Sequence, residues 1–191
     1  MEERFVVDDV RERLILCGLK ELEGHGIGDF SLRRVASMAQ VSCAAPYRHF
    51  KDKEALILAI IAHVREGWEL LAEDISALCS NDPAELALRL SVASARFWIA
   101  NGNFRTVLLS GGGELDVERR EQLTRFDQPI RNATDALCLK SGGDPEELYY
   151  SVSALIYGTV SLVACGTYGT ENGVEKLKIA LTKLLAHPGA C

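Results

Sequence analysis

Glycine and proline interrupt this sequence at intervals that match the length of helices, and the apolar residues between them recur every three to four positions. In the segment 53–78, for example, Leu56, Ile60 and Val64 follow one another at four-residue steps. This spacing places apolar side chains on one face of an α-helix, whereas strands show strict alternation, which is missing here. We therefore expect an all-α protein of about nine helices.

Local start and stop signals define the expected helices. Gly24 and Gly26 supply the backbone freedom to end the first helix, and Ser31 is a good N-cap for the second. Proline stands at the first position of two later helices, where its missing N–H is harmless. The expected helices span about 9–23, 31–39, 43–50, 53–78, 83–101, 117–139, 145–166 and 172–186, and a further short helix in the stretch 104–114 runs into the loop 111–113.

Charge is unevenly distributed along the chain. The whole sequence has a net charge of −6, yet residues 31–53 hold five basic side chains against one acidic, a net +4. A duplex attracts a local basic patch, and an acidic remainder discourages non-specific association. The basic segment coincides with two short expected helices joined by a tight turn at Gln40 and Val41. Such a helix-turn-helix places its second helix in the DNA major groove.

The segment SLRRVASMAQVSCAAPYRHFKDKEALILAII closely resembles the DNA-binding segment of the TetR (tetracycline-repressor-like) family. The resemblance covers residues 10–62 and is most specific in the run from Tyr47 to Leu56. It implies a helix-turn-helix DNA-binding domain in residues 1–55, with three helices. It also implies a C-terminal helical domain, residues 56–191, for ligand binding and dimerisation.

The expected DNA contacts come from the second and third helices and the start of the fourth. Tyr47, His49 and Lys53 can donate to phosphate oxygens, and the N-terminus of the fourth helix adds the positive end of its dipole. Arg33 and Arg48 are the better candidates for reading guanine, because guanidinium bonds O6 and N7 together. The full predicted set is Ser31, Arg33, Arg34, Ser42, Cys43, Ala44, Ala45, Tyr47, Arg48, His49 and Lys53.

Three of these positions leave alternatives open. Arg34 is either a phosphate contact or a solvated surface charge. Ser42 is expected to cap a helix that begins at Cys43, and a thiol at a helix start is either a small residue chosen for fit or an oxidation switch that releases DNA. The family often has glycine in the turn where this chain has Gln40, so we expect a left-handed backbone strained by about 1 kcal/mol there.

The C-terminal helices carry scattered aromatic residues and one helix with small side chains. By resemblance, aromatic residues on the long helices line a ligand cavity, although ordinary core packing is the alternative; the set is Trp68, Phe97, Trp98, Phe104, Phe126 and Tyr157. Small residues on one helix and leucines on the last predict a two-fold dimer interface: Gly158, Ser161, Ala164, Leu177, Leu181 and Leu184. A dimer suits a palindromic operator.

Several function classes are excluded by the sequence. No catalytic motif, cofactor-binding motif or metal-ligand spacing is present, and Gly111-Gly112-Gly113 lacks the residues of a phosphate loop. The charged N-terminus and the lack of a long apolar run predict a cytoplasmic protein without a membrane span. We expect a small-molecule-responsive repressor that binds double-stranded DNA. The alternative is a helix-turn-helix dimer that serves as a protein-interaction scaffold on DNA.

Overall fold

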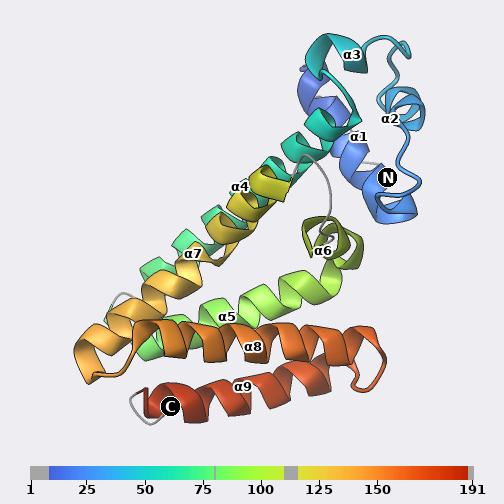
Figure 1. Cartoon of the computed structure of the whole chain (residues 1–191). Coiled ribbons are helices and arrows are strands. Elements are labelled where there is room, and N and C mark those ends of the chain that lie inside the picture. The colour runs from blue at the N-terminus through green and yellow to red at the C-terminus, as the bar shows by residue number, and fades with distance from the viewer. Residues whose placement is uncertain (1–8, 80, 110–115, 189–191) are drawn as a thin grey trace. The chain divides into compact units, whose positions relative to one another are not determined.

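The computed structural model describes residues 9–79, 81–109 and 116–188 (Figure 1). These residues form nine helices and no strand, which confirms the all-α class. In chain order the helices are α1 (Val10–His25), α2 (Leu32–Met38), α3 (Pro46–His49), α4 (Lys53–Leu78), α5 (Pro83–Ala100), α6 (Gly102–Leu109), α7 (Asp116–Ser141), α8 (Pro145–Ala164) and α9 (Thr170–Ala186).

Capping residues account for most of the helix starts. Asp82 accepts hydrogen bonds from the N–H groups of Ala84 and Glu85, and Asp144 does the same for the first turn of α8. A proline follows each of these aspartates as the first helical residue. Both starts were predicted, because a capping carboxylate and a proline satisfy or remove the N–H groups that a helix leaves unpaired.

The third helix differs from its prediction. It begins at Pro46 rather than at Cys43, and Ala45 is its N-cap, with no side-chain hydrogen bond. Residues 43 and 44 form a turn, closed by the Ala45 N–H, which donates to the Ser42 carbonyl at 2.9 Å. Proline explains the late start, because it disfavours helical backbone at the residue before it and suits the first helical position. The prediction that Ser42 caps this helix was wrong.

Gly24 also differs from its prediction, because it lies inside α1 rather than ending it. The helix ends two residues later at its C-cap Gly26, whose φ of 68° places it in the left-handed region. Its N–H still donates to the Leu22 carbonyl.

The chain divides into two compact units. Unit 1 contains residues 1–66 and 103–123, and unit 2 contains residues 67–102 and 124–191. Helices α4 and α7 therefore each contribute residues to both units. The functional boundary at residue 55 stays a prediction.

Unit 1 is held by a close approach of α1 to α4. Leu14, Leu22 and Leu56 are fully buried. A Cβ atom placed on Gly18 would lie 2.7 Å from the Ile60 side chain, which is inside van der Waals contact. Any larger residue at position 18 would therefore require the end of the Ile60 side chain to move.

Unit 2 is built around α5, α8 and α9, which pack mutually. The side chains that fill the space between them are almost completely buried: Leu90, Val152, Ile156, Val160, Leu177 and Leu181. A Cβ atom on Gly173 would lie 2.6 Å from the Val163 side chain, so α9 also approaches its neighbour at a glycine.

Within the described residues, no helix is long and apolar enough to cross a membrane. The Gly111–Gly113 segment lies outside the described residues.

Candidate nucleic-acid interface

The helix-turn-helix is formed by α2, a tight turn and α3. The Ser31 side chain accepts a hydrogen bond from the Arg34 N–H at 3.4 Å, which confirms the predicted start of α2. Gln40 has a φ of 56°, so the turn adopts the left-handed backbone expected from the sequence. Val35 and Ala36 are fully buried, which anchors α2 to the body of unit 1.

The short helix α3 presents polar side chains outward. Tyr47, Arg48 and His49 are all exposed, and Tyr47 is 62% accessible. Pro46 and Phe50, at the two ends of this stretch, are buried and hold the helix in place. A phenol, a guanidinium and an imidazole on an outward face are donors that can reach phosphates or base edges.

The turn before α3 carries smaller groups. Ser42, Cys43 and Ala44 are exposed and Ala45 is half-buried. Cys43 lies in the turn, three residues before the helix begins, so the helix-start argument for a reactive thiol no longer applies. The exposed methyl group of Ala44 remains suited to close approach to a base edge.

Lys53 lies at the junction of three segments. Its ammonium donates to the carbonyl oxygen of Ile27 at 3.0 Å and sits 5.8 Å from the centre of the Phe30 ring. The first residue of α4 is therefore tied to the turn between α1 and α2. An ammonium has three donors, so this contact leaves capacity for a phosphate oxygen.

The N-terminus of α4 holds a carboxylate of its own. Asp52 accepts a hydrogen bond from the Ala55 N–H at 2.8 Å. A carboxylate at this position offsets the positive end of the helix dipole. The expected attraction of phosphate to this helix end is weakened as a result, and the cationic side chains carry the larger share.

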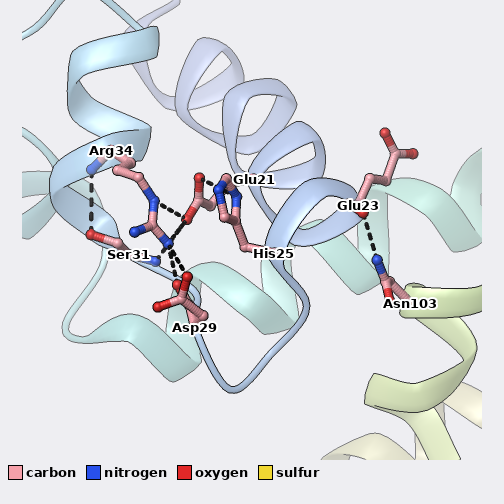
Figure 2. A network of polar contacts seen from close by, with 7 residues as sticks. All are labelled: Glu21, Glu23, His25, Asp29, Ser31, Arg34 and Asn103. Carbon is pink, nitrogen blue, oxygen red and sulfur yellow. Dashed lines mark hydrogen bonds and ion pairs between the residues drawn. The ribbon is translucent and has the colours of Figure 1, made fainter.

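A network of polar contacts joins α1 to α2 and to the turn between them, and it was not predicted from the sequence (Figure 2). The Glu21 side chain, on α1, is only 1% exposed. Its Oε1 accepts from the Arg34 Nε at 2.7 Å and from the Ser31 backbone N–H at 3.1 Å, and the His25 Nδ1 lies 3.2 Å from its Oε2. Arg34 also contacts the side chain and the carbonyl of Asp29.

Burial raises the pKa of the Glu21 carboxyl, but the hydrogen bonds from Arg34 and the Ser31 N–H outweigh it. The pKa of Glu21 therefore lies below its ordinary value of 4.5. Glu21 in turn raises the pKa of Arg34. This ion pair joins α1 to α2, and so positions the helix-turn-helix on its supporting helix.

Arg34 was predicted to be either a phosphate contact or a solvated surface charge, and neither prediction includes the ion pairs that it forms within its own chain. Its guanidinium is engaged by Glu21 and Asp29, and its DNA contact stays a prediction. Glu21 itself lies on the buried stripe of α1, seven residues after Leu14. A carboxylate on an apolar helix stripe needs a cationic partner, so the periodicity contained the signal.

Five of the six predicted cavity aromatics gather in unit 2. The Trp68 and Phe126 rings stack at 5.5 Å, the Trp98 ring lies 4.9 Å from Phe126, and the Phe97 ring lies 4.9 Å from Phe126. Tyr157 lies 6.3 Å from Trp98. Phe104 belongs to unit 1 and is buried there. The Trp68, Trp98 and Phe126 side chains are at most 2% exposed, so they form a packed ring cluster.

A separate groove in unit 2 has a volume of about 520 Å³. Helices α4, α5 and α7 line it with mostly polar side chains: Glu69, Ala72, Glu73, Ser76, Leu86, Arg125, Gln128, Pro129, Asn132 and Ala133. None of the predicted cavity aromatics borders this groove.

The predicted dimer residues divide into two groups. Gly158, Ser161 and Ala164 are exposed on α8, as an interface requires. Leu177 and Leu181 are at most 1% exposed, and Leu184 is half-buried. The two buried leucines fill the core of their own chain, so the prediction that they meet a partner needs correction. Ile179, which is 50% exposed, is the large apolar side chain that α9 leaves accessible.

Residues 16–60 match the family model described as bacterial regulatory proteins, tetR family. The match runs from the middle of α1 to the first part of α4, and thus includes α2, the turn and α3. No curated protein matches the sequence.

Solved structures share the fold over nearly the whole chain. A protein of unknown function from Rhodococcus sp. RHA1 has a TM-score of 0.78 at 20% identity, covering 98% of this chain and 100% of its own. The transcriptional regulator FadR from Bacillus subtilis, in complex with stearoyl-CoA, has a TM-score of 0.73 at 15% identity, covering 91% and 96%. NalD from Pseudomonas aeruginosa, the secondary repressor of the MexAB-OprM multidrug efflux pump, has a TM-score of 0.68 at 21% identity, covering 92% and 96%.

Proposed function

We propose that this chain, a member of the TetR family, is a cytoplasmic repressor that binds a palindromic operator as a homodimer and releases it when a small molecule binds. The observation that carries the proposal is the outward Tyr47-Arg48-His49 face of α3, within the segment that the family model matches. The regulators among the structural neighbours support the same role, because they share the fold of both units.

DNA recognition is assigned to two sets of side chains. Arg48 and Arg33 read base edges, and Tyr47, His49 and Lys53 contact phosphates. The residues before α3, from Ser42 to the half-buried Ala45, approach the groove closely. Arg34 acts mainly by positioning α2, because its ion pair with Glu21 fixes the angle between α1 and α2.

Dimerisation is assigned to the exposed faces of α8 and α9. Gly158, Ser161 and Ala164 let a partner helix approach closely, and Ile179 offers apolar area. Two-fold symmetry then sets two recognition helices about 34–36 Å apart, which is one turn of DNA. An effector releases the operator if it binds more tightly to a dimer in which the two recognition helices have a different separation, because it then shifts the protein to that state.

Two of the structural neighbours support a small-molecule effector without identifying it. FadR was solved with stearoyl-CoA, and NalD represses a multidrug efflux pump. For this chain, we assign effector binding to unit 2, where the ring cluster of α4, α5, α7 and α8 gathers.

The test is selection of genomic DNA fragments by the purified protein, followed by titration of the selected fragment at several salt concentrations. We expect retention that weakens steeply with salt, since phosphate contacts release counterions. Replacing Arg48 by alanine should weaken binding to the selected fragment by about 1–3 kcal/mol. Lack of any salt-sensitive retention contradicts the proposal.

The matched control is Arg89→Ala, the same substitution at an exposed arginine of α5. It removes one positive charge from the chain but lies outside unit 1. We expect it to leave DNA affinity unchanged. An equal loss in both variants would mean that binding follows overall charge rather than the α3 face.

A further inference from the structure

The ring cluster of unit 2 borders a partly buried carboxylate. Asp127 follows Phe126 on α7, and its carboxylate faces α8, where it accepts hydrogen bonds from the phenol groups of Tyr149 and Tyr157. Tyr157 also packs against Trp98. Aromatic rings and a carboxylate therefore form one continuous group drawn from α4, α5, α7 and α8.

The hydrogen bonds of this carboxylate are incomplete. Tyr149 donates to Oδ2 at 3.0 Å, but Tyr157 lies 3.3 Å from Oδ2 and 3.4 Å from Oδ1. Bonds between a hydroxyl and an oxygen normally measure about 2.7–2.8 Å, so Oδ1 is poorly satisfied by the described residues. Burial raises the pKa of the Asp127 carboxyl, although the phenols and Arg131 act in the opposite direction.

Arg131, the cation one helical turn after Asp127, is committed elsewhere. Arg131 Nη1 donates to Glu146 Oε2 at 2.6 Å, and its guanidinium lies 3.9 Å from the centre of the Tyr149 ring. Two carboxylates thus share one guanidinium. Asp127, Glu146 and Arg131 together carry a net charge of −1, and Asp127 is joined to the ring cluster through Tyr157.

This group has a partly accessible edge. Asp127, Tyr149, Tyr157 and Phe97 are partly accessible, whereas the rings behind them are buried. A molecule that arrives from solvent reaches these partly accessible side chains without displacing the buried rings.

From this arrangement, and resting on the effector-responsive function proposed above, we propose that Asp127 and the surrounding aromatic rings recognise the cationic head of an effector with an aromatic or alkyl body. A cation supplies the charge that the carboxylate lacks and is attracted to the electron-rich faces of the rings. An organic ammonium binds here without requiring Arg131 to leave Glu146.

The two tryptophans of the chain both belong to the ring cluster, so intrinsic tryptophan fluorescence reports binding at this place. The full chain is titrated with phenyltrimethylammonium and, separately, with tert-butylbenzene, its neutral isostere. We expect the cation to change the fluorescence saturably and to bind about tenfold more tightly than the isostere. Equal affinities, or no saturable change with either probe, overturn the proposal.

Asp127→Asn removes the charge and keeps the shape. We expect it to abolish the preference for the cation, while Asp135→Asn, the same change two turns further along α7, keeps the preference. Circular dichroism verifies that both variants fold. A preference that survives in folded Asp127→Asn contradicts the assignment.

Glu146→Gln tests whether the cation preference depends on the charge of Asp127, without altering Asp127. Glu146 is 73% exposed, so its replacement does not threaten the fold. It frees Arg131 to pair with Asp127, and we expect the affinity for phenyltrimethylammonium to fall severalfold. Unchanged or increased affinity would contradict the charge argument.

DNA retention of the wild-type protein is measured in parallel. Failure of probe binding with intact DNA retention removes only the effector class. Failure of DNA retention with intact probe binding removes the proposed regulatory function and leaves the cation site standing.

Discussion

Glu21 in unit 1 and Asp127 in unit 2 are both shielded from solvent, but their partners differ in charge. Glu21 meets a guanidinium, a histidine and a backbone N–H, and its pKa is lowered despite burial. Asp127 meets two neutral phenols, and its pKa is raised. Burial alone therefore does not indicate what a carboxylate does. Its partners decide whether it fixes two helices together or remains available for a ligand.

The largest expected effect is on the Glu21 contact. Arg34→Leu leaves the buried Glu21 carboxylate without its guanidinium partner, and among the single variants we expect here the largest fall in the free energy of unfolding. Urea denaturation measures the change. Arg33→Leu, on the exposed face of α2, should stay within about 0.5 kcal/mol of the wild type.

If the loss in Arg34→Leu comes from an unpaired charge, removing that charge should restore stability. The double variant Glu21→Leu/Arg34→Leu should regain most of the loss, because an apolar pair replaces the ion pair. A double variant as unstable as the single one would show that the contact contributes packing rather than charge compensation.

A smaller effect of opposite sign is expected at Asp127. Asp127→Asn removes a poorly compensated charge and keeps an acceptor for the phenols. At neutral pH we expect a gain of up to about 1 kcal/mol in the free energy of unfolding. A loss above 2 kcal/mol in urea denaturation would make Asp127 a structural residue like Glu21, and the contrast would disappear.

The two carboxylates should also respond oppositely to pH. Because the pKa of Glu21 is lowered on folding, its contribution is present above about pH 4.5 and is lost as the pH falls through the folded value. Because the pKa of Asp127 is raised, its contribution is present below about pH 3.8 and is lost as the pH rises through the folded value.

Unfolding free energies of the wild type, Glu21→Gln and Asp127→Asn measured between pH 3 and pH 7 test this sign. The disadvantage of Glu21→Gln should shrink toward acid. The advantage of Asp127→Asn should grow toward neutral pH. Parallel trends for the two variants would contradict the assignment.

The smallest effect concerns strain inside unit 1, where a favourable ion pair coexists with an unfavourable turn. Gln40 adopts a φ of 56°, which glycine tolerates at lower cost. We expect Gln40→Gly to stabilise the protein by about 0.5–1 kcal/mol, measured as a shift in Tm. A drop in Tm would mean that the side chain of Gln40 stabilises the turn.

The sequence predicted those features that depend on neighbouring residues. The bounds of α4, the caps at Ser31, Asp82 and Asp144, and the left-handed turn at Gln40 follow from propensities and backbone sterics within a few positions. The start of α3 was missed because the effect of Pro46 on the preceding residue was outweighed by the apparent cap at Ser42.

Features that depend on distant residues were not predicted. The Glu21–Arg34 pair spans thirteen positions, and Asp127 meets phenols twenty-two and thirty residues away. Periodicity gives the face on which such a side chain lies, but the partner depends on how helices pack. For the same reason Leu177 and Leu181 were assigned to a partner's surface when they fill the core of their own chain.

Unit 1 is not a continuous stretch of chain, since residues 103–123 belong to it along with residues 1–66. Within it, the Asn103 side chain donates to the Glu23 carbonyl at the end of α1, as Figure 2 shows. During synthesis, the first 66 residues therefore leave the ribosome well before their remaining packing partners do. The DNA-binding part is completed only after α5 has emerged, so an N-terminal fragment ending at residue 66 would lack part of its own core.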